Sequence, residues 1–271
     1  ATPVAATAVG AMRAHWAGLG ESTFVGGIWV LYGVHRWLGR WPFRLLLVPV
    51  VSLYWLFSRT ARQASLQYLQ RLQDHAATFS GPPGNLQSLR HFLQFGETLL
   101  DKLLASSGRY SPSLLQFVGQ QALLARHASG KGGVIMTAHV GCLELLQAAA
   151  GWQSGMRLTV LVHTAPAEKF NRILTRLNPT SAMQLSGRVA AGGFIAIAGD
   201  RVPVSGDRHV RATFLGHSAA WPSGPYLLAA LLDCPLFMMV SLHHGKGYRV
   251  HIELLAEHVD LPRAQRQHAL N

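Results

Sequence analysis

The segment 133–150 most constrains the fold, because its structural preference changes abruptly in the middle. β-branched Val134 and Ile135 lie in an apolar run that favours a strand, whereas residues 143–150 are strong helix formers. Gly141 lies between the two halves and permits a tight turn. The pattern predicts a buried strand, a turn and a helix in immediate succession.

Two helices are predicted, one on either side of a Gly-Pro-rich break at residues 80–85, and helices alternate with strands from about residue 114 onward. The expected helices cover residues 60–78, 86–104, 114–128, 143–151, 167–177 and 223–232. The expected strands cover residues 133–138, 157–163, 193–198, 210–214, 235–243 and 247–254. Alternating strands and helices predict an α/β fold, with a mixed, mostly parallel sheet covered by helices.

A histidine and a glutamate flank the predicted turn. His139 follows the strand, and Glu144 comes five residues later in the predicted helix. On one straight helix the two would lie roughly 140° apart around the axis, so only a break between them could bring them together. We expect the Glu144 carboxylate to hydrogen-bond one imidazole nitrogen and leave the other free to accept a proton from a hydroxyl or amine. The pair is thus predicted to be a general base with its orienting acid.

Four blocks of the chain occur in a recognisable order. They are the H-x-x-x-x-E block within 132–144, an arginine-bearing segment with Asn-Pro at 167–179, an apolar strand ending in Asp-Arg at 194–201, and a Phe-Leu-Gly loop at 212–225. Together with His-Trp and Glu residues at 15–21, these blocks resemble the lysophospholipid acyltransferase superfamily. Within it they most resemble the lauroyl/myristoyl (lipid A biosynthesis) acyltransferase branch, and the resemblance covers most of the chain.

This resemblance implies an acyltransferase that moves an acyl chain from a thioester to a hydroxyl or amine of a lipid or glycolipid. The implied donor is acyl carrier protein, with coenzyme A as the alternative, and no other cofactor is needed. Acceptors in this branch include lipid A-type glycolipids, phosphoglycolipids and lipids that carry an aryl polyene chain. The sequence does not choose among them. Neither C-x-x-C nor H-E-x-x-H is present, so we expect no metal.

Two arginines lie where the branch has a functional arginine. Arg172 or Arg176 is expected to hold a phosphate or to polarise the thioester carbonyl, and the alternative is a solvated helix face. The chain is strongly basic, with a net charge of +12, and a basic enzyme suits an acidic carrier protein. No zinc-finger spacing, basic helix or RNA-binding signature occurs, so nucleic acid is not an expected partner.

Four further residues are predicted to contact substrate. Asp200 and Arg201 end an apolar strand, where function collects in α/β sheets. Asp200 is expected either to position the acceptor or to support the base. Phe214 and Gly216 are expected to shape the acyl pocket.

Composition points to a membrane surface, because 49% of the residues are hydrophobic and only 13% are charged. Two apolar, aromatic-rich runs at 24–32 and 43–57 are separated by a basic stretch, and neither reaches the roughly 20 residues of a spanning helix. We therefore expect a membrane-associating helical segment at 1–58 and an acyltransferase domain at 59–271. The protein would lie peripherally or monotopically on the cytoplasmic face of the bacterial inner membrane. A buried helical hairpin is the alternative.

Other chemistries are less well supported. Cys142 lies close to His139, but the reaction does not require an acylated thiol. Ser218 follows a glycine as in half of a G-x-S-x-G motif, and the second glycine is absent. Two rival functions remain open: an acyl-thioester hydrolase that uses the same His and Glu on water, and a non-catalytic membrane-binding module.

Overall fold

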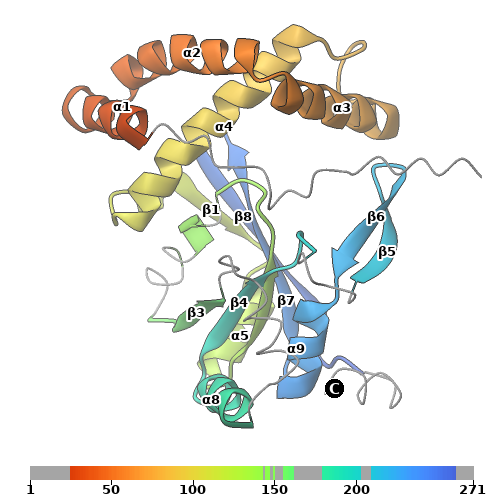
Figure 1. The fold of residues 1–271 in the computed structure, drawn as a ribbon. Coiled ribbons are helices and arrows are strands. Elements are labelled where there is room, and N and C mark those ends of the chain that lie inside the picture. The colour runs from red at the N-terminus through yellow and green to blue at the C-terminus, as the bar shows by residue number, and fades with distance from the viewer. Residues whose placement is uncertain are drawn as a thin grey trace, which may run out of the picture.

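The computed structural model describes residues 25–142, 144–146, 149, 155–161, 179–202 and 209–260. The helices are α1 (Val25–Leu38), α2 (Arg40–Phe57), α3 (Arg59–Ala76), α4 (Asn85–Ser106), α5 (Gln121–Ala128), α8 (Pro179–Ala190) and α9 (Gly224–Leu232). The strands are β1 (Leu115–Val118), β2 (Gly133–Thr137), β3 (Leu158–Leu161), β4 (Phe194–Ala198), β5 (His209–Phe214), β6 (His217–Pro222), β7 (Leu236–His244) and β8 (Gly247–Ala256). Helices α1 to α4 lie at one end of the molecule, and helices α5, α8 and α9 lie beside the sheet (Figure 1).

Six of these strands form one sheet in the order β1-β8-β7-β2-β4-β3. Strands β2, β3, β4 and β7 run in the same direction, whereas β8 is antiparallel to β7 and parallel to β1. The predicted mixed, mostly parallel α/β sheet is therefore confirmed. Strands β5 and β6 form a separate antiparallel hairpin.

Helices cover both faces of the sheet, because neighbouring residues of the central strand enter different buried clusters. Val134 packs with residues of α8 and α9, and the next residue, Ile135, packs on the opposite face near Leu123 of α5. A strand buried on both faces reads as a continuous apolar run, as this one does.

One predicted helix is partly a strand, and two elements, strand β6 and helix α8 (Pro179–Ala190), form where no element was predicted. Residues 115–118, expected within a helix, form strand β1 beside β8. Gly119 ends that strand at φ +79°, and a Cβ there would lie 2.1 Å from the carbonyl oxygen of Ile252. Strand β6 was also not expected, and the partner β5 provides its hydrogen bonds. The predicted helix at 167–177 lies outside the described residues.

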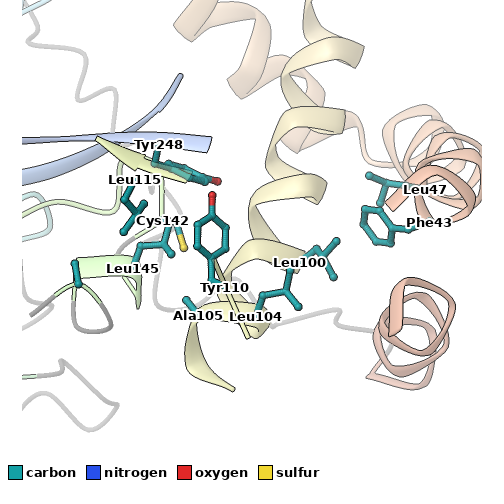
Figure 2. Close-up of a cluster of buried hydrophobic side chains, with 11 residues drawn as sticks. Phe43, Leu47, Leu100, Leu104, Ala105, Tyr110, Leu115, Cys142, Leu145 and Tyr248 are labelled. Carbon is teal, nitrogen blue, oxygen red and sulfur yellow. The ribbon is translucent and has the colours of Figure 1, made fainter. Parts of the chain in front are cut away.

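The N-terminal helices join the sheet through α4. Phe43 and Leu47 of α2 are buried in a cluster that includes Leu100 of α4 and continues to Tyr110 and Tyr248 (Figure 2). Helix α2 therefore shares a core with strand β8. The boundary between 1–58 and 59–271 coincides with the α2–α3 junction at Ser58, and a division into two domains there stays a prediction.

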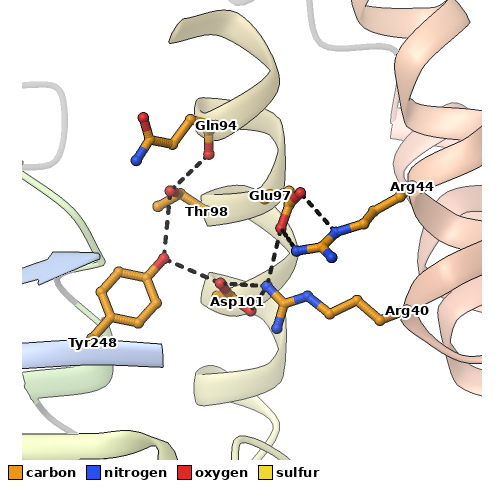
Figure 3. A network of polar contacts seen from close by, with 7 residues as sticks. All are labelled: Arg40, Arg44, Gln94, Glu97, Thr98, Asp101 and Tyr248. Atoms are coloured by element: carbon orange, nitrogen blue, oxygen red, sulfur yellow. Dashed lines mark hydrogen bonds and ion pairs between the residues drawn. The ribbon is translucent and has the colours of Figure 1, made fainter. Parts of the chain in front are cut away.

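Ion pairs reinforce this junction. Arg40 donates to the Asp101 carboxylate at 3.0 Å, and Arg44 pairs with Glu97 at 2.8 Å (Figure 3). The Tyr248 hydroxyl donates to the same Asp101 carboxylate at 3.1 Å, although Asp101 is only 1% exposed. Burial raises the pKa of Asp101, while Arg40 and Tyr248 act against that shift.

The outer side of α1 and α2 is strongly apolar. Its exposed large hydrophobic residues are Val30, Trp37, Leu38, Trp41, Leu45, Leu46, Val48, Val50, Leu53, Tyr54, Leu56 and Phe57. We call this set the α1–α2 apolar surface. Among the described residues, no single helix has the length and hydropathy to cross a membrane; helices α2 and α3 meet the test only as a pair bent by 96°. Attachment to a membrane stays a prediction.

Candidate active site

His139 and Asp200 meet at one edge of the sheet. Strands β2 and β4 are adjacent and parallel, so the residues that follow them emerge at the same edge. The Gly199 N–H donates to the Thr137 carbonyl oxygen at 2.8 Å, which continues the strand pairing to the start of the site. Beyond this point, the segments that follow β2 and β4 bring His139 and Asp200 together.

The Asp200 carboxylate accepts two hydrogen bonds from His139. Oδ2 accepts the backbone N–H at 2.8 Å, and Oδ1 lies 2.9 Å from ring Nδ1. Because an ionised carboxylate only accepts hydrogen bonds, the ring proton belongs on Nδ1. Nε2 of the neutral ring then carries the lone pair. The arrangement can serve a general base, since the carboxylate also stabilises the imidazolium that forms.

The charge state of Asp200 follows from its surroundings. Burial acts to raise the pKa of the carboxyl group, but the hydrogen bonds from the His139 ring and backbone outweigh burial, so the pKa lies below its usual range. Asp200 is therefore ionised at neutral pH. The His139 side chain is 34% exposed, so a substrate can reach it.

Glu144 has a different partner from the one expected. Its carboxylate lies 2.9 Å from Nζ of Lys102 in α4, and the carboxylate on the His139 ring is that of Asp200. The predicted contact between Glu144 and the imidazole is therefore corrected. The reason is topological: β4 delivers Asp200 beside His139, whereas α4 offers a cation to Glu144. A catalytic role for Glu144 stays a prediction.

Cys142 is unsuited to nucleophilic attack. The residue is 1% exposed and belongs to the same buried cluster as Leu145 and Tyr110 (Figure 2). Burial raises the pKa of the thiol to about 12, so it is protonated at neutral pH. A neutral, buried thiol is a poor nucleophile. This agrees with a reaction that needs no acylated cysteine.

The other candidate residues lie outside the described residues, directly after Asp200 or on the β5–β6 hairpin. Arg172 and Arg176 lie outside the described residues. Arg201 directly follows Asp200 and is exposed. Phe214 lies on the β5–β6 hairpin, 48% exposed and edge-on to Trp221, and Gly216 occupies the turn at φ +76°. A role for the last two in an acyl pocket stays a prediction.

Two residues of the site were missed by sequence reasoning. Lys102 is a partly exposed residue of α4, and no sequence pattern distinguishes it from any other lysine. Ser241 is a buried polar residue in the middle of apolar strand β7. That position was a readable signal, because a buried hydroxyl needs a hydrogen-bond partner. Its partner is the backbone of Cys142, three residues after His139.

Within the described part of the chain, no three His, Cys, Asp or Glu side chains gather in a group that could hold a metal ion. No protein-family model matches the chain, and no curated protein matches it significantly.

Proposed function

We propose that the protein is a membrane-associated acyltransferase, which moves an acyl chain from a thioester to a hydroxyl or amine of a lipid or glycolipid. The observation that carries the proposal is the His139–Asp200 pair, in which the half-buried Asp200 carboxylate fixes Nδ1–H and leaves Nε2 as the basic nitrogen. The resemblance of the blocks around His139 to the lauroyl/myristoyl acyltransferases supports the choice of reaction.

The proposed reaction needs one base. Nε2 of His139 takes the proton of the acceptor hydroxyl as its oxygen attacks the thioester carbonyl carbon. The C–O bond forms and a tetrahedral oxyanion develops. The intermediate collapses, the C–S bond breaks, and the proton passes from the imidazolium to the departing thiolate. Asp200 orients the ring and stabilises the imidazolium throughout. Glu144 is paired with Lys102 of α4 at 2.9 Å, five residues after this base.

The membrane part of the proposal rests on the α1–α2 apolar surface. Among the described residues of these two helices, twelve large hydrophobic side chains are exposed, and monomeric soluble proteins rarely expose large apolar patches. Cations flank it: Arg36 lies over the Trp37 ring at 5.7 Å, and Arg59 is exposed beyond the end of α2. Aromatic rings and cations beside aliphatic side chains suit the interfacial zone of an anionic bilayer. Acyl carrier protein is the proposed donor because the chain has a net charge of +12.

The test is a reconstituted transfer assay. The purified protein is given an acyl carrier protein thioester and vesicles of a hydroxyl-bearing glycolipid, and mass spectrometry measures the acylated lipid and the free fatty acid. His139→Ala should lower transfer by on the order of 100-fold or more.

His258→Ala is the matched control, because this exposed histidine also pairs with an aspartate, Asp233, at 2.9 Å. It should keep wild-type transfer. Release of free fatty acid without acylated lipid would favour a thioester hydrolase. Vesicle binding without turnover of any thioester would favour a binding module.

A further inference from the structure

The chain that carries His139 leaves the sheet in a short loop. Strand β2 pairs with β7 from Val134 opposite Leu236 to Met136 opposite Met238. If this register continued, the residue opposite Ser241 would be His139. The residue found there is Gly141, two positions further along. Two extra residues are therefore looped out of the ladder, and His139 belongs to that loop.

One hydroxyl closes this loop at its far end. The Cys142 N–H donates to Oγ of Ser241 at 3.1 Å, and the Ser241 hydroxyl donates to the Cys142 carbonyl oxygen at 2.6 Å. Ser241 is 0% exposed, so water cannot replace its hydroxyl without rearrangement. Gly141 has φ +69°, and a Cβ there would lie 1.6 Å from the Ser241 carbonyl oxygen. The backbone of the loop therefore lies directly against β7.

The loop is anchored at both ends and spans only three residues between them. At its start, the Thr137 carbonyl accepts the Gly199 N–H. At its end, Gly141 and Cys142 are fixed on Ser241. A displacement of Gly141 and Cys142 consequently moves His139 as well, because so short a segment has few other conformations that connect its two fixed ends.

We infer that Ser241 is a positioning residue for His139, acting through the backbone of Cys142 and Gly141. Asp200 sets the orientation of the ring, and Ser241 sets where the backbone presents it. The inference about catalysis rests on the proposed function. A misplacement of about 1 Å can cost on the order of 100-fold in rate, so a hydroxyl that never touches substrate can control turnover.

The experiment compares Ser241→Thr with Ser241→Val. Threonine and valine have nearly the same shape, but only threonine keeps the hydroxyl. We expect Ser241→Thr to keep kcat within about threefold of wild type and Ser241→Val to lower kcat by about 10- to 100-fold, with a smaller change in KM. If the valine variant does not fold, Ser241→Ala takes its place in the comparison.

Ser88→Ala controls for a merely structural effect. Ser88 is also 0% exposed and has two side-chain hydrogen bonds, with Trp55 and Ser65 at 3.0 Å each, but it lies in α4. It should lose thermal stability as Ser241→Val does, and its folded fraction should keep wild-type kcat. Equal kcat for Ser241→Val and Ser88→Ala, per folded molecule, would overturn the inference.

A spectroscopic readout separates this inference from the proposed function. The Nδ1–H of His139, assigned by its loss in His139→Ala, is followed by nuclear magnetic resonance of protein with ¹⁵N-labelled histidine. In Ser241→Val we expect its signal to shift and to exchange faster with solvent, and in Ser88→Ala to stay unchanged. An unchanged signal in Ser241→Val would overturn the positioning role. If the signal changes in Ser241→Val but the wild-type protein transfers no acyl group, the positioning role is retained and the proposed function is refuted.

Discussion

At the scale of single residues, the site depends on which carboxylate serves His139. Sequence reasoning favoured Glu144, because it lies five residues away in a motif. The structure places Asp200, 61 residues away in sequence, on the ring. Spacing within a motif cannot reveal this contact, since it arises from the pairing of β2 with β4. The histidine itself was predictable, because it follows a clearly apolar strand.

The two carboxylates can be compared directly. We expect Asp200→Asn to lower kcat by on the order of 100-fold or more, because a neutral amide cannot stabilise the imidazolium. Glu144→Gln should cost less, because its carboxylate pairs with Lys102 at 2.9 Å. Steady-state kinetics of both variants measure the difference. A larger loss in Glu144→Gln than in Asp200→Asn would return the orienting role to Glu144.

Asp200 should also make stability depend on pH. Its pKa is lower in the folded protein than its usual value, so its hydrogen bonds stabilise the fold above the usual carboxyl pKa and stop doing so as the pH falls through the folded pKa. Asp200→Asn should therefore lower the free energy of unfolding at about pH 7 more than at about pH 3. Urea denaturation at both pH values measures this. An equal loss at the two values would contradict it.

At the scale of elements, strands with continuous apolar runs were predictable and elements that depend on a distant partner were not. Strand β4 and most of β2 are buried on both faces, and β7 is apolar from Leu236 to Val240, so these runs could be recognised in the sequence. Strand β1 has the pattern of a helix continuation and is a strand only because β8 offers it an edge. The small residues Ser218 to Ala220 of β6 gave no signal, and the hairpin partner determines their conformation.

The junction between α2 and α4 allows a quantitative test. Asp101→Ala removes the carboxylate that Arg40 and Tyr248 share, and we expect it to lower the free energy of unfolding by about 3 kcal/mol or more, as for other broken buried pairs. Glu97→Ala should cost about 1 kcal/mol or less, because Glu97 and its partner Arg44 are partly exposed. Chemical denaturation compares the two. Similar losses would mean that the burial of Asp101 does not determine its contribution.

At the scale of the whole molecule, many of the apolar residues of this hydrophobic chain are exposed on α1 and α2, where they form the α1–α2 apolar surface. Its membrane role is best tested by point substitutions, because deleting the helices would also uncover the cluster that holds Phe43 and Leu47. Leu45→Ser with Leu53→Ser should weaken co-sedimentation with anionic vesicles severalfold, since both side chains are more than half exposed.

Leu255→Ser is the control for this experiment, because it changes an exposed leucine on β8. It should leave vesicle binding unchanged. High salt should release the wild-type protein only in part, because apolar burial persists when charges are screened. Complete release by salt, or equal losses in both variants, would contradict a role for the α1–α2 apolar surface.

The bond between Asp101 and Tyr248 has a consequence for how the chain is made. Helix α2 is synthesised before β8, because Tyr248, which donates to Asp101, follows the α2 residue Arg40 by 208 residues. At roughly 5–20 residues per second, translation needs about 10–40 s to supply it. During that interval β8 is not yet available to pair with β1 and β7 or to contact Asp101 of α4. The α1–α2 apolar surface is therefore synthesised before the strand that completes the core it shares with α4.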